Sequence, residues 1–358
     1  MKKYLVFLFI LLAISERLLT FEIGSLNIGL FDISIVVVSI YIFLNKIYIP
    51  KFYIIFISYF ILSNIFIFFF INNNVSLTSI LTVPLKLILV VYLAKHTKES
   101  KIHLQLCFLT FILLFVGLLT ISDASLFFDV ELLNRNETIA YLLSIIYLIP
   151  NNKKKLKITL LILLILTSFA VQSRQIVIGL ILALIIFSFL NFRKFFKYVP
   201  LIIIISISLT YYFTNVYYKN LDEYNKRRYE ISSVESRTRA DRDRFFNIVW
   251  GIENSSKSLL IGQGTGSYVR LNPLKKVSHN SYLTSLFENG IVGLIMFLIL
   301  LFKSKPNKQD KLANFIFIIM MGQIIFIESI GKFFIYIYFM KSIMLNKEKY
   351  FSKTFIKK

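Results

Sequence analysis

The chain has 358 residues, of which 57% are hydrophobic, and its formal net charge is +22. A soluble globular domain is about 45–50% apolar, whereas this chain has 37 Phe and 20 Tyr residues but only 12 Gly and 6 Pro. No soluble fold of this size buries that much apolar surface, so we expect a bilayer to cover it. The single cysteine, Cys107, excludes both a disulfide framework and a cysteine-based metal cluster.

Apolar runs of nearly the length of a transmembrane helix recur along the chain. A hydrocarbon core of about 30 Å requires about 20 helical residues, with a range of roughly 17–25. The runs are continuously apolar rather than alternating, which favours helices over barrel strands. We therefore predict an all-α polytopic membrane protein with about ten to twelve transmembrane helices. The predicted spans are residues 4–19, 33–44, 52–71, 79–94, 104–121, 138–150, 156–171, 176–190, 199–213, 281–302, 312–327 and 330–345.

The basic residues predict the orientation of these spans. If the spans cross the bilayer in turn, 24 of the 41 Lys and Arg residues fall on the side of the N-terminus. The short loops on the opposite side, residues 72–78 and 122–136, contain one Arg between them. Because Lys and Arg are retained in the cytoplasm, both termini are predicted to be cytoplasmic. The high net charge therefore reflects topology and anionic inner-leaflet lipids, and it does not imply a nucleic-acid partner.

The predicted organisation is one membrane domain interrupted by one large insert. Residues 1–213 form helices one to nine, and residues 281–358 form helices ten to twelve with a basic cytoplasmic tail. Residues 214–280 form an extracytoplasmic loop, which translocates despite its charge because it is long. We expect short helices in this loop, near residues 255–271, to pack on the membrane domain. Internal repeats and matched broken helices, which indicate many transporters, are absent from the sequence.

Several ionisable residues on the outer side could carry chemistry. Arg174 lies at the outer end of the eighth span, where it either snorkels to headgroups or binds an anion such as phosphate. His279 lies where the loop re-enters the membrane, and it is either structural or a proton shuttle. A cluster of arginines alternates with acids in the loop, as expected for a self-paired helix face or for contacts with an anionic headgroup. Its members are Arg237, Arg239, Arg242 and Arg244.

Two further motifs near these residues bear on ligand binding. Asp241 and Asp243 have the D-x-D spacing of metal-dependent sugar transferases, but the flanking arginines would compete with a metal ion, so no metal site is expected. Gly262, Gly264 and Gly266 form a G-x-G-x-G sequence that predicts tight backbone turns. No parallel strand precedes them, so a dinucleotide site is not indicated.

Taken in chain order, these motifs resemble the O-antigen polymerase and O-antigen ligase superfamily of bacterial envelope glycosyltransferases. The signature of that superfamily is an Arg opening an amphipathic stretch, then G-x-G-x-G, then His-Asn and an acidic-x-Gly element. The matching residues are Arg244, the glycines at 262, 264 and 266, His279-Asn280 and Glu288-Asn-Gly290. Ser173-Arg174 and Asn134-Arg-Asn136 resemble two further elements, whereas Leu259 stands where the superfamily often has proline.

The resemblance implies a GT-C-like fold in a bacterial cytoplasmic (inner) membrane, with the active site facing outside. It implies that glycan is transferred from undecaprenyl diphosphate to a sugar hydroxyl, without metal or cofactor and with inversion. Arg174 and Arg244 would stabilise the diphosphate, and His279 would activate the hydroxyl. A chain-length regulator protein is a further candidate partner beside membrane lipids. The implied substrate-binding residues are Arg237, Arg239, Arg242, Gly262, Gly264, Gly266, Asn280 and Glu288.

The sequence is compatible with three hypotheses about the activity. The favoured reading is a polymerase of O-antigen or capsule repeat units, which serves lipopolysaccharide or other polysaccharide biosynthesis. An O-antigen ligase of the same superfamily has nearly the same motifs. A flippase of lipid-linked oligosaccharide fits the number of spans, but it does not account for the long loop after the ninth span.

Overall fold

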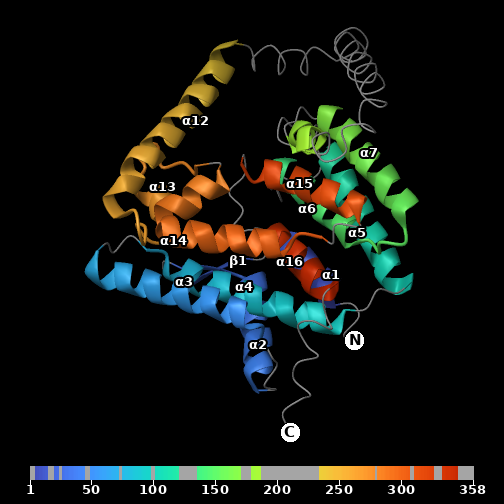
Figure 1. The fold of residues 1–358 in the computed structure, drawn as a ribbon, viewed down its shortest axis with the longest axis horizontal. Helices are drawn as coiled ribbons and strands as arrows, with labels where there is room; N and C mark the ends of the chain where they lie inside the picture. The colour runs from blue at the N-terminus through green and yellow to red at the C-terminus, as the bar shows by residue number, and fades with distance from the viewer. Residues whose placement is uncertain are drawn as a thin grey trace.

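A computed structural model describes most of the predicted spans (Figure 1). Helices occupy every predicted span except residues 199–213, which lie outside the described part of the chain. The described residues are 5–14, 20–23, 26–44, 49–71, 75–97, 101–120, 135–170, 179–186, 234–278, 280–306, 310–325 and 333–345.

The helices follow the apolar runs of the sequence. Residues 179–186 form a further helix inside the predicted eighth span. A short 3₁₀ turn, η2 (Ser256–Ser258), follows α12. The labelled α-helices are α1 (Leu5–Ile14), α2 (Leu30–Leu44), α3 (Lys51–Phe70), α4 (Leu77–His96), α5 (Lys101–Thr120), α6 (Arg135–Leu148), α7 (Lys154–Ala170), α12 (Val234–Ser255), α13 (Ser267–Leu271), α14 (Ser281–Lys303), α15 (Lys311–Gln323) and α16 (Phe333–Leu345).

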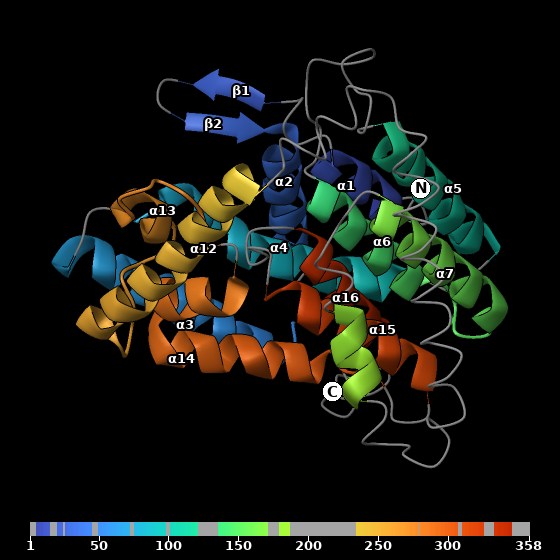
Figure 2. The same ribbon diagram turned by 90° about the horizontal axis from the view of Figure 1, so that it is seen from above.

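One hairpin departs from the expected all-helical chain. Strands β1 (Thr20–Ile23) and β2 (Leu26–Gly29) pair antiparallel, with Ile23 opposite Leu26. The hairpin projects from the start of α2 (Figure 2). The backbone N–H and C=O groups of the two strands pair with each other, which satisfies them without a helix.

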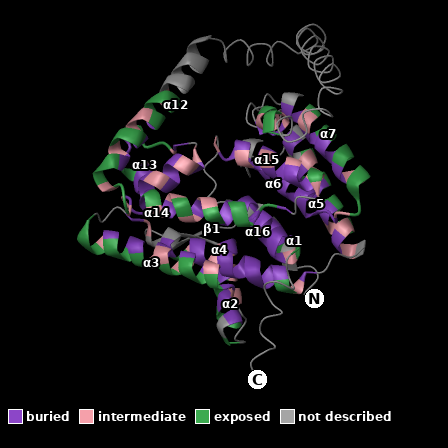
Figure 3. Cartoon of the chain, in the orientation of Figure 1, coloured by how far each residue is buried: buried purple, intermediate pink, exposed green. Residues whose placement is uncertain are grey.

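The centre of the bundle consists of α4, α6 and α16. Helix α16 packs on both α4 and α6, and α6 also packs on α5, α7 and α15. These three helices are buried on nearly every side (Figure 3), and residues 138–150 are buried without interruption. A helix that is apolar all round needs such a position or a membrane, because it has no polar face for water.

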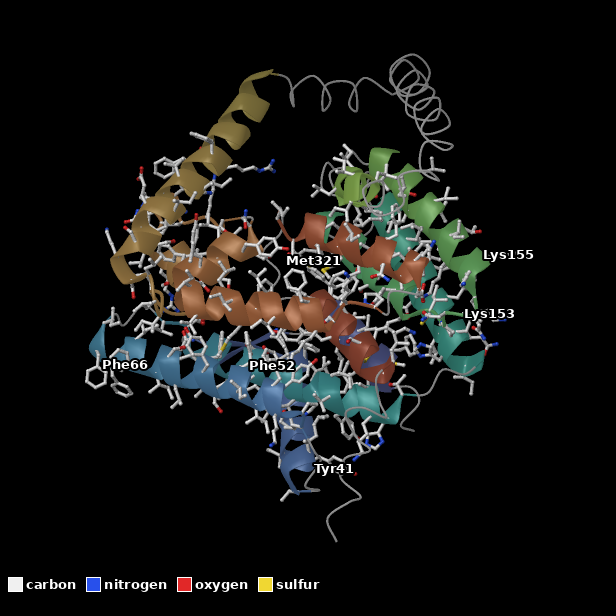
Figure 4. The ribbon with its side chains drawn as sticks, viewed as in Figure 1. Tyr41, Phe52, Phe66, Lys153, Lys155 and Met321 are labelled. Atoms are coloured by element: carbon white, nitrogen blue, oxygen red, sulfur yellow. The ribbon has the colours of Figure 1, made fainter. Side chains whose placement is uncertain are left out.

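The outer helices expose apolar stripes instead of polar faces. On α3, Leu62 is 66% exposed and Phe69 is 70% exposed, and Phe66 points away from the bundle (Figure 4). Helices α2, α5 and α7 carry similar exposed apolar residues at helical spacing. Within the described ranges, α3 and α14 are long and apolar enough to cross a membrane. Exposed apolar area on this scale indicates contact with lipid, and we conclude that the chain associates with membranes.

Candidate functional site

Helix α14 is broken at Gly290, and the break is the structural centre of the candidate site. Gly290 has φ 67° and ψ −174°, a conformation adopted essentially by glycine alone. A Cβ atom there would lie 2.2 Å from the carbonyl oxygen of Leu260. The backbone N–H groups of Ile291 and Val292 donate to the carbonyls of Leu259 (2.8 Å) and Leu260 (3.4 Å). The loop therefore supplies acceptors to N–H groups that have lost their helical partners.

The carbonyl groups on the other side of the break are also satisfied. Two of them accept hydrogen bonds from the backbone of the same loop, and the third accepts from a tyrosine on α3. The bonds are Gln263 N–H to Phe287 O (2.9 Å), Gly264 N–H to Glu288 O (2.8 Å) and Tyr59 OH to Asn289 O (2.8 Å). Residues 259–266 and 287–292 thus form one unit, which we call the loop–helix junction.

The three glycines of the G-x-G-x-G motif allow this close approach. Gly262, Gly264 and Gly266 all have positive φ, at 82°, 90° and 80°. A Cβ at Gly262 would lie 2.3 Å from the Glu288 carbonyl oxygen, and one at Gly264 would lie 2.4 Å from a methyl group of Val75. The motif and the acidic-x-Gly element are therefore two halves of the same backbone packing arrangement.

A buried amide pair fixes the junction to α3. Asn64 is fully buried, and its Oδ1 accepts a hydrogen bond from the Thr265 N–H at 2.7 Å. Its Nδ2 donates to Phe60 O at 2.8 Å and to the side-chain oxygen of Asn289 at 3.4 Å. The Thr265 hydroxyl donates to the same Asn289 oxygen at 3.4 Å. Every polar atom named here has a partner, which makes the burial of two amides energetically acceptable.

Glu288 and α13 connect the junction to α12. The Tyr268 backbone N–H donates to Oε1 of buried Glu288 at 3.3 Å, and the Tyr268 hydroxyl donates to Asn247 O at 2.5 Å. The Asn272 side chain donates to Oδ1 of Asn247 at 2.9 Å. Helices α12, α13 and α14 are consequently held together by hydrogen bonds rather than by apolar packing alone.

The segment that leads to His279 lies against α12, close to Arg244. Asp243 and Lys276 form an ion pair at 2.6 Å, and the Asn247 side chain donates to Val277 O at 3.5 Å. Arg244 follows Asp243 directly and has an exposed side chain. The middle of α12 therefore contacts residues 276–277, immediately before the predicted catalytic histidine.

The start of α14 is fixed directly after His279. Oδ1 of Asn280 caps the helix by accepting from the Leu283 N–H at 2.9 Å. The Ser281 N–H donates to Ile324 O at 3.0 Å, just beyond the end of α15. The Tyr282 hydroxyl donates to Met321 O at 3.2 Å, in the region where Figure 4 labels Met321. We call this contact the α14–α15 junction.

The helix that follows Arg174 reaches the same place. Gly179 and Gly322 approach so closely that a Cβ at Gly322 would lie 2.6 Å from the Gly179 Cα. Gly322 is one residue before the end of α15 and two before Ile324. The segments that follow residues 174 and 279 therefore meet at the α14–α15 junction, and α12 contacts residues 276–277, a few residues before that junction.

The described residues include only part of the predicted site. Arg174 and His279 lie outside them, and so do the side chains of Arg237, Arg239 and Arg242, which belong to α12. The three glycines, Asn280 and Glu288 are described, and all have partners or close contacts within the chain. That these residues contact a substrate is still a prediction.

The site also contains three residues that belong to none of the sequence motifs, namely Asn64, Gln323 and Trp250. Gln323 is 1% exposed, and its Nε2 has no hydrogen-bond partner among the described residues. Amides within apolar spans are costly, and this signal alone could have identified Asn64 and Gln323. Trp250 is the single tryptophan of the chain, but its role depends on neighbours far away in sequence.

A known protein family matches part of the chain. The family described as O-antigen ligase matches residues 159–298. That range includes Arg174, the arginines of α12, the glycine motif, His279, Asn280 and Glu288. No curated protein and no solved structure matches the chain.

Proposed function

We propose that this chain, whose residues 159–298 match the O-antigen ligase family, is a polymerase of lipid-linked oligosaccharide repeat units. It would transfer glycan from undecaprenyl diphosphate to a sugar hydroxyl at the outer face of the inner membrane. Both termini would be cytoplasmic. The observation that supports this proposal is that the segments after Arg174 and His279 meet at the α14–α15 junction, while α12 contacts residues 276–277 next to Arg244.

Chain connectivity allows these three residues to share one substrate. Arg174 is five residues before Gly179, and five residues of extended chain span at most about 17 Å. His279 is two residues before Ser281, whose N–H contacts Ile324 O. Asp243, the neighbour of Arg244, pairs with Lys276, five residues before Ser281. A diphosphate bound between these contacts would be within reach of all three side chains.

The reaction requires cations at the departing group and a base at the incoming hydroxyl. The acceptor oxygen forms a bond to the anomeric carbon, and the bond from that carbon to the diphosphate oxygen breaks. His279 would take the hydroxyl proton, while Arg174 and Arg244 would stabilise the charge on the released lipid diphosphate. Direct displacement inverts the anomeric centre, and the two guanidinium groups supply the charge that a metal ion supplies in other transferases.

The described residues of the predicted substrate-binding set would act mainly by shaping the site. The N–H groups of Gly262 and Gly264 donate to carbonyl oxygens of the chain, so these glycines would position the loop. Asn280 would fix the orientation of the His279 backbone through the α14 cap, and Glu288 would hold α13 in place. Arg237, Arg239 and Arg242 would add positive charge along the approach to Arg244.

A ligase is the second candidate, because the matching family is described as O-antigen ligase. A ligase would transfer a finished polymer to a different acceptor by the same displacement. The two activities are distinguished by deleting the gene and analysing the surface polysaccharide. Single capped repeat units indicate a polymerase, accumulated lipid-linked polymer indicates a ligase, and unchanged glycan contradicts both.

The site assignment has a matched set of variants. Arg174→Ala, Arg244→Ala and His279→Ala should each abolish the polymer ladder while leaving the amount of protein in the membrane unchanged. Arg270→Ala and His96→Ala are the controls, because Arg270 donates to Val75 O and His96 ends α4. A ladder of wild-type length from all three site variants would overturn the assignment.

A further inference from the structure

A cavity of about 410 Å³ lies beside the loop–helix junction, and Arg244 is not among its lining residues. Its volume falls in the range of roughly 300–1,000 Å³ that is typical of small-ligand sites. We call it the outer cavity. Its lining residues are Ile71, Trp250, Asn254, Lys257, Gln263, Leu271 and Phe287.

The outer cavity has a rigid aromatic wall. The rings of Trp250 and Phe287 lie 5.2 Å apart at 34°, and Tyr268 packs edge-on against Trp250 at 5.4 Å and 88°. Tyr268 is itself fixed, because its hydroxyl donates to Asn247 O. Trp250 remains partly exposed. An aromatic face held in this way can stack on the apolar C–H face of a sugar ring without losing side-chain entropy on binding.

Polar side chains of the kind that bind hydroxyl groups surround this wall. Asn254 donates through Nδ2 to Trp250 O at 2.8 Å, which leaves its Oδ1 to accept from a ligand. The backbone N–H of Gln263 is bonded to Phe287 O, so the position of its side-chain amide is anchored. Lys257 adds an ammonium donor. Two amides and one cation beside an aromatic face match sugar hydroxyls better than a lipid chain or a diphosphate.

The outer cavity is also close to the proposed reaction centre. Phe287 is six residues after Ser281 on the first half of α14, which corresponds to about 9 Å along the helix. A glycan chain held against Trp250 would therefore extend toward the α14–α15 junction.

From this lining and position, we infer that the outer cavity is a sugar-binding subsite that holds a residue of the glycan chain. The inference rests on the proposed function, since that function supplies the glycan. The subsite would keep the acceptor in place between additions, so it would govern product length rather than the displacement step.

The single tryptophan gives a direct assay of this subsite. The probe is the repeat-unit oligosaccharide freed from its lipid by mild acid, titrated into purified full-length protein in detergent. Trp250 emission should change saturably, and Asn254→Leu and Gln263→Ala should each raise Kd about tenfold, the effect of losing one hydrogen bond. Asn314→Leu, at the other end of the bundle, is the control and should bind normally.

Two comparisons separate this inference from the proposed function. His279→Ala should bind the oligosaccharide normally although chain growth is lost, and inorganic diphosphate alone should leave Trp250 emission unchanged. The inference is overturned if the oligosaccharide gives no change while the wild-type protein extends chains, or if diphosphate alone saturates the signal. Normal binding by both Asn254→Leu and Gln263→Ala would also overturn it.

Discussion

Gly290 determines how the loop and the membrane helices fit together. Its positive φ breaks α14, and its missing Cβ lets Leu260 approach the backbone. Five backbone polar groups released at the break then find partners in residues 259–264 and in Tyr59. A membrane protein tolerates a broken helix only when such groups are satisfied again.

Replacing Gly290 by alanine should therefore destabilise the whole junction. The strained φ alone costs about 1–3 kcal/mol, and the Cβ contact with Leu260 O at 2.2 Å adds to it. We expect the thermal unfolding midpoint in detergent to fall by several degrees and the polymer ladder to disappear. Val292→Ala, two residues later, should cause a smaller fall. Equal midpoints for Gly290→Ala and the wild-type protein would contradict this assignment.

A substitution at Gln323 separates an effect on the reaction from an effect on the stability of the fold. Its Nε2 is buried at the α14–α15 junction, and no residue in the described part of the chain accepts a hydrogen bond from it. Removing a buried unsatisfied donor is neutral or stabilising by about 1–3 kcal/mol, so Gln323→Leu should unfold no earlier than the wild-type protein.

If Nε2 of Gln323 donates a hydrogen bond to the substrate, Gln323→Leu should still slow chain growth about tenfold. This is the effect of losing one hydrogen bond in the transition state. Asn314→Leu on the same helix is the reverse control. The Asn314 side chain donates to Asp310 O at 2.8 Å, so its loss should lower stability and not the rate per folded molecule. An unchanged rate in Gln323→Leu would leave Gln323 without a role in the reaction.

At the scale of elements, hydropathy predicts the spans well because a continuous apolar run of sufficient length has few alternatives to a helix in a bilayer. Hydropathy does not predict the hairpin of β1 and β2, because the hairpin depends on the pairing of two strands that are too short to give a clear pattern. Hydropathy does not predict the break at Gly290 either, for a different reason. Its partners, Leu259 and Leu260, lie about thirty residues earlier in the sequence.

The candidate site, too, can be predicted from the sequence only in part. The motifs that contain Arg244, the glycines and His279 can be recognised in the sequence, since each has an unusual residue type for its position. That the glycines pack against Glu288, and that Trp250 lines a cavity with Gln263, depends on contacts between distant segments. Sequence spacing alone does not specify these contacts.

A charge exchange tests the contact between α12 and the segment before His279. Asp243 and Lys276 are 26% and 53% exposed, so their pair is worth at most about 1 kcal/mol. Lys276→Glu should slow chain growth by a factor of about two to five, because like charges then repel beside Arg244. Combining it with Asp243→Lys should restore the rate, and the defect should shrink at high salt. A double variant no better than Lys276→Glu would contradict the contact.

At the scale of the whole molecule, exposed apolar and exposed basic side chains lie on different parts of the bundle. Apolar stripes cover α3, α5 and α7, while Lys153 and Lys155 gather at the connection between α6 and α7 (Figure 4). The outer cavity and the loop–helix junction lie at the far end of α3, next to Ile71. The connection between α6 and α7, with its two lysines, and the outer cavity thus lie in different parts of the bundle, and the predicted orientation would place them on opposite sides of the membrane.

Cysteine labelling checks this orientation against a clean background, since the only native cysteine, Cys107, is fully buried. Ser256→Cys, exposed beside the outer cavity, should react with an impermeant maleimide on intact cells. Asn152→Cys, exposed between α6 and α7, should react only after the membrane is opened. Labelling of Asn152→Cys on intact cells would contradict the predicted topology.

The most direct test of the proposed function is chain growth by the purified protein in lipid vesicles. The substrate is the undecaprenyl diphosphate-linked repeat unit alone, and the products are resolved by length together with the released lipid diphosphate. We expect a ladder, one lipid diphosphate released per new linkage, and neither product from Arg174→Ala, Arg244→Ala or His279→Ala. A wild-type protein that builds no ladder, or three variants that all build one at the wild-type rate, would contradict the proposed function.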